Sequence, residues 1–237
     1  MNNTWTSILT ISLAFTAVKG AHATSWADVE AQLRHTDFGQ EALQIKARYG
    51  VDVDPVHGSA QAAAYYPKTN HCELNMSKPT YEVATYFVHE MYHALQARTG
   101  KSPNATTDEA RAMGKDAWVK MMVEEEIEGT YRGFQHKIAL EFGKKTILVP
   151  TPQADAPVGM TPFRKSYLYA YVQSMKSDRD MAKAHRAGLK KGRDTIVEMI
   201  TGGSERFQFT RTRLGGTGGV SYTLKYRHEW DLDNKKR

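Results

Sequence analysis

Most of the chain follows a helical repeat of apolar and polar residues. Between Ser25 and Tyr49, apolar residues recur every three or four positions, which predicts one or two amphipathic helices that end at Gly50. A further helix is predicted to begin near Pro79, because proline suits the first turn, and to end before Gly100. The same repeat predicts helices over residues 108–118, 121–138, 163–176 and 179–200.

Two segments instead alternate around turn-forming residues. Residues 62–66 and 71–76 flank the sequence Pro-Lys-Thr-Asn at 67–70, which predicts a β-hairpin leading directly into the helix that follows. Farther along the chain, residues 206–212 and 220–226 flank a glycine-rich run and predict a second hairpin. Together these elements predict an α+β fold that is mainly helical, with a small N-terminal hairpin or sheet.

The first residues have the pattern of a secretion signal. An apolar run at residues 8–18 is short for a membrane span, and Ala-His-Ala at 21–23 is a small-x-small cleavage site, although no Lys or Arg precedes the run. We therefore predict a signal peptide over 1–23 and a secreted or periplasmic mature chain with no membrane span. The remainder is expected to form a core over 24–150 and a helical segment over 151–237, which packs on the core and ends in the second hairpin.

The composition is that of a globular chain with enough apolar residues for a substantial core: 237 residues, 41% hydrophobic and 24% charged. The formal net charge is +6, but Lys and Arg are interleaved with Asp and Glu through much of the chain. We therefore expect a solvated basic surface and no nucleic-acid partner. Cys72 is the only cysteine, which excludes an intrachain disulfide.

The strongest chemical signal is a His-Glu-x-x-His motif formed by His89, Glu90 and His93. Residues four apart lie one turn apart on the same face of a helix, so both imidazoles can bind one metal ion. Apolar residues at helical spacing give this helix a buried stripe. The two histidines lie together on the neighbouring side of the helix. Glu90 then lies beside the metal, where a carboxylate can act as a general base.

A catalytic zinc site usually has a third protein ligand, and a carboxylate is one recognised choice. A second helix carries four glutamates, of which Glu126 shares one side with Gly129, Thr130 and Gly133. Because the two glycines allow a close approach to the histidine helix, we select Glu126 as the third ligand. Glu125 is the second choice for the third ligand. Glu124 also remains a candidate, because it borders the apolar side of the helix.

With these two motifs, the chain resembles a zincin metallopeptidase of the gluzincin type, in which a His-Glu-x-x-His helix is followed by a helix that supplies a glutamate. It is similar to peptidase domains of bacterial secreted proteins and toxin-like effectors over roughly residues 60–145. The resemblance implies that His89, His93 and a glutamate bind one Zn²⁺ per chain, and that Glu90 is the catalytic base. The fourth position after the glutamate is usually Asp or Asn in that family, whereas Thr130 follows Glu126 here.

A zincin-like domain implies hydrolysis of a peptide or protein substrate, with the zinc activating water and Glu90 moving the proton. An oxyanion donor is also expected in such an enzyme. Candidates that the sequence does not rank are Tyr131, His136, Tyr222 and His228.

Two other classes fit the same sequence. One is a non-enzymatic basic binding module. The other is a structural zinc protein in which Cys72 or another histidine supplies a fourth ligand and closes the site. The sequence alone does not indicate the substrate, the oligomeric state or a cognate inhibitor.

Overall fold

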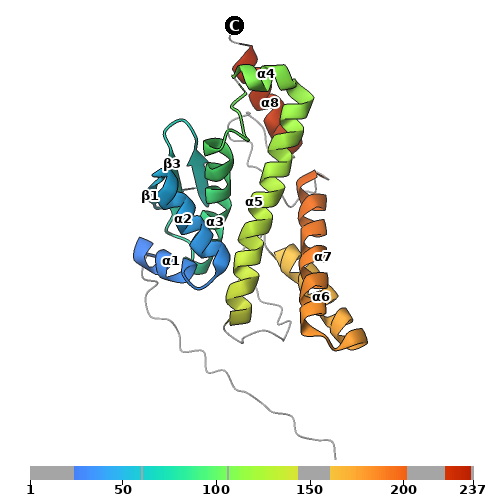
Figure 1. The fold of residues 1–237 in the computed structure, drawn as a ribbon. Helices are drawn as coiled ribbons and strands as arrows, with labels where there is room; N and C mark the ends of the chain where they lie inside the picture. Colours follow the sequence, from blue (N-terminus) through green and yellow to red (C-terminus); the bar gives the residue numbers. More distant parts are fainter. Residues whose placement is uncertain (1–23, 60, 106, 144–160, 202–221, 236–237) are drawn as a thin grey trace, which may run out of the picture.

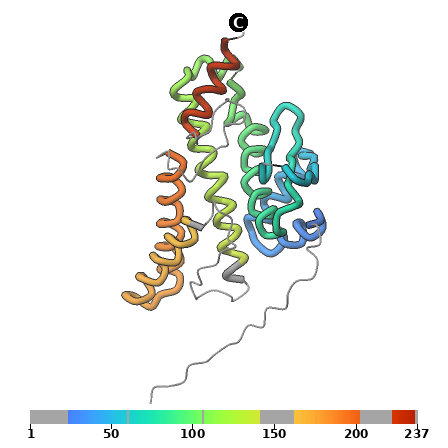
Figure 2. Tube along the Cα trace, turned by 180° about the vertical axis from the view of Figure 1, so that it is seen from behind, coloured from blue at the N-terminus to red at the C-terminus, as the bar shows by residue number. Residues whose placement is uncertain are grey.

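The computed structural model describes residues 24–59, 61–105, 107–143, 161–201 and 222–235. The fold is mainly helical with one small sheet, as the sequence predicted (Figure 1). The longest helix, α5 (Lys115–Gly143), runs through the middle of the molecule. The N-terminal helices and the sheet lie on one side of α5, and two C-terminal helices lie on the other, as the view from behind also shows (Figure 2).

The N-terminal layer consists of α1 (Trp26–Leu33), α2 (Asp37–Tyr49), the sheet and α3 (Thr80–Arg98). Helix α1 begins at a capping box, in which the Ser25 side chain and the Asp28 backbone are paired, and α2 ends at Gly50 in the left-handed conformation. The predicted one or two helices before Gly50 are therefore two. Apolar side chains from all these elements share one core whose fully buried members include Val29, Leu33, Leu74, Val83 and Phe87.

The sheet has three strands in the order β1-β3-β2. Strands β2 (Ala63–Tyr66) and β3 (His71–Asn75) form the predicted antiparallel hairpin, which leads into α3. Strand β1 (Asp52–Val56) pairs in parallel with β3 and was not predicted, because Asp52, Asp54 and Pro55 are residue types that strands usually avoid. Strand β2 is an edge of the sheet and lies against α3.

A second core joins α4 (Asp108–Met113), α5, α6 (Thr161–Asp178), α7 (Met181–Thr201) and α8 (Tyr222–Asn234). The predicted helix over 108–118 is interrupted at Gly114, whose φ of 84° ends α4 before α5 begins. Helices α6 and α7 match the two predicted C-terminal helices and pack side by side.

The predicted second hairpin is wrong where the structure describes it. Residues 222–226, expected to be strand, form the first turn of α8. Tyr222, Tyr226 and Trp230 are four residues apart, and on a helix they lie on one face. Tyr226 and Trp230 pack against Trp118 with ring centroids 5.8 and 5.4 Å away, so tertiary contacts decide the helical state. Residues 206–212 lie outside the described residues.

The predicted signal peptide over 1–23 also lies outside the described residues and stays a prediction. Among the residues that the structure describes, no helix has both the length and the apolar composition required to cross a membrane.

Candidate metal centre

Helix α3 carries the two motif histidines between the two cores. Its apolar side, which includes Val83, Phe87 and Met91, is fully buried in the N-terminal core. His89 and His93 lie on another side of the helix and face α5, with 16% and 14% of their side chains exposed. The apolar repeat of the sequence therefore orients α3 so that its histidines point at the helix that carries the glutamates.

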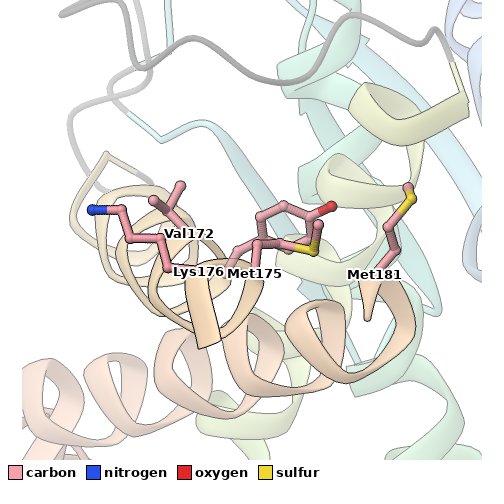
Figure 3. A pocket seen from close by; sticks show the side chains of 5 residues that line it. Val172, Met175, Lys176 and Met181 are labelled. Carbon is pink, nitrogen blue, oxygen red and sulfur yellow. The ribbon is translucent and has the colours of Figure 1, made fainter. Parts of the chain in front are cut away.

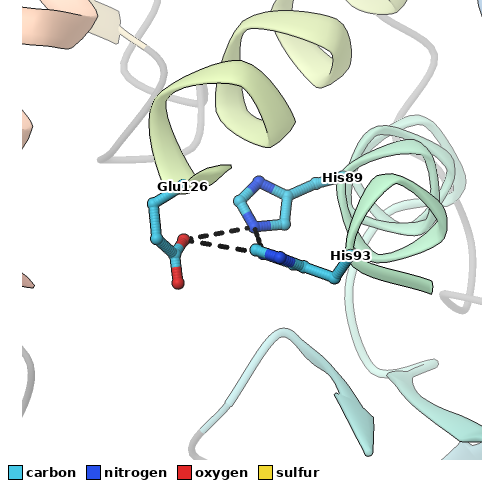
Figure 4. A group of neighbouring side chains, drawn as sticks. All are labelled: His89, His93 and Glu126. Atoms are coloured by element: carbon cyan, nitrogen blue, oxygen red, sulfur yellow. Dashed lines mark hydrogen bonds and ion pairs between the residues drawn. The ribbon is translucent and has the colours of Figure 1, made fainter. Parts of the chain in front are cut away.

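His89, His93 and Glu126 converge on one point (Figure 4). The Nε2 atoms of the two histidines are 2.9 Å apart. Oε2 of Glu126, which reaches across from α5, lies 3.4 Å from Nε2 of His89 and 3.7 Å from Nε2 of His93. The two predicted ligands on one helix and the selected ligand on the other therefore form one group.

The spacing and chemistry of these three atoms fit a metal ion. Zinc bonds of about 2.0–2.1 Å in a tetrahedral arrangement place neighbouring ligand atoms about 3.3 Å apart. The observed separations of 2.9, 3.4 and 3.7 Å lie on both sides of that value. Two imidazoles and one carboxylate are also a donor set that zinc accepts in catalytic sites.

Two glycines of α5 allow the two helices to approach closely, as the sequence predicted. A Cβ atom added at Gly129 would lie 3.3 Å from the ring of His89, and one added at Gly133 would lie 2.9 Å from the carbonyl oxygen of Thr85. A side chain at Gly133 would therefore push α5 away from α3. Because Glu126 is on the same side of α5, these glycines set its distance from the histidines.

Each histidine also has a partner for its second ring nitrogen. Nδ1 of His93 donates to Oε1 of Glu125 at 2.6 Å, which fixes the ring so that Nε2 faces the metal position. Nδ1 of His89 lies 3.4 Å from the hydroxyl of Thr130, the residue that departs from the family pattern. Glu125, the second choice for the metal ligand, therefore orients the candidate ligand His93. Glu124 lies on the solvent side, with 65% of its side chain exposed.

The other carboxylate oxygen of Glu126 is held by helix α8. Oε1 accepts a hydrogen bond from the hydroxyl of Tyr226 and lies 3.8 Å from Nζ of Lys225. Burial alone would raise the pKa of Glu126, but His93, His89 and Lys225 outweigh it and hold that pKa well below its usual range. Glu126 is therefore an ionised carboxylate with one oxygen held by α8 and the other directed at the two histidines.

The same carboxylates act on His93. Burial alone would lower the pKa of this imidazole, but Glu126 and Glu125 outweigh it and raise the pKa well above its ordinary value. In the absence of a metal ion, the side chains of His93, Glu125 and Glu126 form an ionic group in which the imidazole faces both carboxylates. Binding of a metal ion must displace the proton of His93, as is general for histidine ligands.

Glu90 lies beside this group and contacts the edge strand. One of its carboxylate oxygens, Oε2, accepts a hydrogen bond of 2.8 Å from the backbone N–H of Tyr65 in β2. This N–H points away from β3. The N–H of Asn75 donates to the carbonyl of Ala62, and because hydrogen-bonded and non-hydrogen-bonded pairs alternate along the ladder, Tyr65, three positions farther on, belongs to a non-hydrogen-bonded pair. The strand therefore orients Glu90 and leaves its other oxygen available.

Only one of the four candidate oxyanion donors lies at this site. Tyr222, in the first turn of α8, is buried beside Glu126 and Glu90; burial, and then these two carboxylates, raise the pKa of its hydroxyl well above the ordinary value. The hydroxyl is therefore a neutral donor at physiological pH. The guanidinium of Arg193 lies over the ring of Tyr131 instead, 5.8 Å from the ring centroid. Among the described residues, no hydrogen bond or ion pair joins His228 of α8 to the ligand group.

His136 has a structural role far from the ligands along α5. It is fully buried, and its Nδ1 lies 2.6 Å from the hydroxyl of Thr36, which caps α2 by accepting from the N–H of Gly39. Burial lowers the pKa of this imidazole to about 4 from 6.5. His136 therefore stays neutral in the folded protein and ties α5 to the first helices.

This burial predicts a specific loss of stability in acid. Between pH 6.5 and about 4, the unfolded chain binds a proton at His136 that the folded chain excludes, so stability falls as the pH falls. We expect the free energy of unfolding to drop by about 2 kcal/mol more between pH 7 and pH 5 in the wild type than in His136→Asn. Urea unfolding at several pH values, with a chelator present, measures this difference. An equal change of the free energy of unfolding with pH in the two proteins would contradict the prediction.

Comparisons with protein-family models, with curated proteins and with solved structures each found no match. The resemblance to gluzincin peptidases therefore rests on the motif residues and on their geometry. What these establish is a buried group of two histidines and one glutamate that could hold a metal ion.

Proposed function

We propose that this protein is a zinc-dependent peptidase whose centre consists of His89, His93, Glu126 and Glu90. The observation that carries the proposal is that the three ligand atoms meet at metal-binding distances while Glu90 is oriented beside them by Tyr65. Zinc, when bound, supplies a Lewis acid and lowers the pKa of water toward neutrality. A structural calcium or magnesium site is disfavoured, because those ions prefer oxygen ligands to imidazole.

The donor set supports a catalytic site over a closed structural one. Among the described residues, the group contains three ligands, and a catalytic zinc site has three protein ligands and an open position. Cys72, the candidate for a fourth ligand, is fully buried in the N-terminal core and is not in the group. The proposal therefore leaves one coordination position for water or substrate.

Glu90 moves the proton in this proposal. Its Oε2 is occupied by the N–H of Tyr65, so the second oxygen takes a proton from the attacking water and delivers it to the leaving amine. Tyr222, whose neutral hydroxyl is hydrogen-bonded to Glu126 in this structure, is the candidate to donate to the oxygen of the scissile carbonyl, where negative charge develops. Glu125 holds His93 in the orientation that the ligand group requires.

Strand β2 gives this site a way to hold an extended peptide. It is an edge strand against α3, and the N–H and C=O of Ala63 and the C=O of Tyr65 point away from β3, while the N–H of Tyr65 is used by Glu90. A substrate strand added there gains main-chain hydrogen bonds beside Glu90 without a demand on its sequence. We therefore propose an unfolded or extended protein segment as the substrate.

The first test is the metal content of the purified protein by elemental analysis. We expect one zinc per chain in the wild type and none in His93→Ala, which removes one ligand and leaves Glu125 without its partner. Lys101→Ala, an exposed change just after the end of α3, is the matched control and should keep its zinc. The proposal is refuted if the purified wild-type protein contains no zinc and gains no stability when zinc is added.

A further inference from the structure

The exposed side of α6 carries two apolar side chains between two lysines. Lys165, Tyr169, Val172 and Lys176 follow one another at helical spacing and all lie on the solvent side of the helix. Tyr169 is 67% exposed and Val172 is 37% exposed. Side chains of this size gain from leaving water, so a continuous exposed set of them indicates a contact with another apolar medium.

The stripe continues into a shallow apolar pocket at the turn between α6 and α7 (Figure 3). The pocket has a volume of about 320 Å³ and is lined by Tyr171, Val172, Met175, Lys176 and Met181. Met181, on α7, is 62% exposed. Methionine is flexible and adapts to irregular apolar partners, so this end of the helix pair offers a deformable apolar surface.

The net positive charge of the protein is concentrated in the same two helices. Residues 161–201 contain nine Lys and Arg against four Asp and Glu, a net charge of +5 in a chain whose net charge is +6. Lys183 and Lys190 are paired with aspartates. Among the residues that the structure describes, Lys165, Lys176 and Arg179 make no ion pair, so the apolar stripe is bordered by uncompensated cations.

We infer that this surface, the α6 stripe of Lys165, Tyr169, Val172 and Lys176 with Met181, binds a lipid bilayer that contains anionic lipids. The apolar side chains enter the boundary between headgroups and acyl chains, and the lysine amines reach the anionic headgroups. A nucleic acid would satisfy the lysines but would leave Val172 and Met181 in water. This inference is independent of the proposed peptidase activity, because the surface shares no residue with the ligand group.

Vesicle sedimentation with the full chain tests the inference. The probes are vesicles of phosphatidylcholine alone and vesicles in which one third is phosphatidylglycerol. Since the apolar run at 8–18 would bind both kinds alike, the quantity to compare is the ratio of anionic to neutral binding. We expect a ratio of at least about ten at low salt, falling as salt is added.

Two double variants separate the two contributions of the surface. Tyr169→Ser with Val172→Ser, and Lys165→Glu with Lys176→Glu, are each expected to lower binding to anionic vesicles by about tenfold or more. The matched controls are Met113→Ser with Leu232→Ser, which are 41% and 49% exposed, and Lys68→Glu with Lys101→Glu, which changes the net charge equally. Circular dichroism checks that every variant is folded.

Three results would overturn the inference. In the first, the stripe variants bind anionic vesicles as well as their matched controls do. In the second, the wild type binds neutral and anionic vesicles equally. In the third, light scattering without vesicles finds a dimer that only the stripe variants lose, which would assign this surface to contact with a second copy.

Discussion

Glu90→Gln is expected to lower the rate of peptide hydrolysis by about 10²- to 10⁴-fold while the protein keeps its fold and its zinc. Glutamine has nearly the same shape as glutamate, and its carbonyl oxygen can still accept the 2.8 Å hydrogen bond from the N–H of Tyr65. It cannot take a proton from water at neutral pH. The measurement is turnover of an unstructured protein substrate, with the zinc content determined on the same samples.

Glu124→Gln is the matched control for this experiment. It makes the same chemical change on a glutamate whose side chain is 65% exposed, and it should leave turnover unchanged. Wild-type turnover in Glu90→Gln would refute the assignment of Glu90 as the general base. Loss of both turnover and zinc would instead mean that Glu90 is required to form the ligand group.

Three adjacent glutamates of α5 are expected to respond very differently to the same substitution. Glu126→Gln should weaken zinc binding by more than about 100-fold, because it removes the only carboxylate in the ligand group. Glu125→Gln should weaken it by about 10- to 100-fold, because Glu125 acts through the ring of His93. Glu124→Gln should not change it. Competition with a chelating dye measures all three affinities.

The order of these three effects is the critical result. An equal loss in Glu125→Gln and Glu126→Gln would place both carboxylates on the metal and contradict the geometry of the ligand group. Unfolding of the metal-free variants by urea separates a change in affinity from a change in stability. The separation is needed because the side chains of Glu125 and Glu126 are each 7% exposed, so a substitution there can also change the stability of the fold.

The sequence was informative wherever the signal is local. His89 and His93 face one point because four residues make about one helical turn, and the hairpin before them is specified by its turn and its alternation. The choice of Glu126 was also local in origin. It followed from the glycines at i+3 and i+7, and the contacts of Gly129 and Gly133 with α3 account for it.

The parts that could not be predicted depend on partners distant in the sequence. The role of Glu125 requires the direction of Nδ1 of His93, 32 positions away, and Tyr226 reaches Glu126 from 100 positions away. Residues 222–226 alternate as a strand does, but their two tyrosines are also four positions apart, as on one face of a helix. The contact of Tyr226 with Trp118 favours the helix over the strand. That aromatic spacing was the signal from which α8 could have been recognised.

The three candidate ligands come from two different cores. His89 and His93 belong to α3 of the N-terminal core, and Glu126 belongs to α5 of the second. A metal ion bound by all three joins these cores, in a chain whose single cysteine excludes an intrachain disulfide. Metal binding free energy is then also free energy for holding the cores together.

The position of α8 has a consequence for the newly made protein. The histidines and Glu126 leave the ribosome long before Tyr222 and Tyr226, the groups that anchor Glu126 and face the reaction centre. A growing chain therefore contains the motif without the helix that completes its surroundings. In the peptidase proposed above, the surroundings of Glu126 are therefore complete only after α8 has been synthesised.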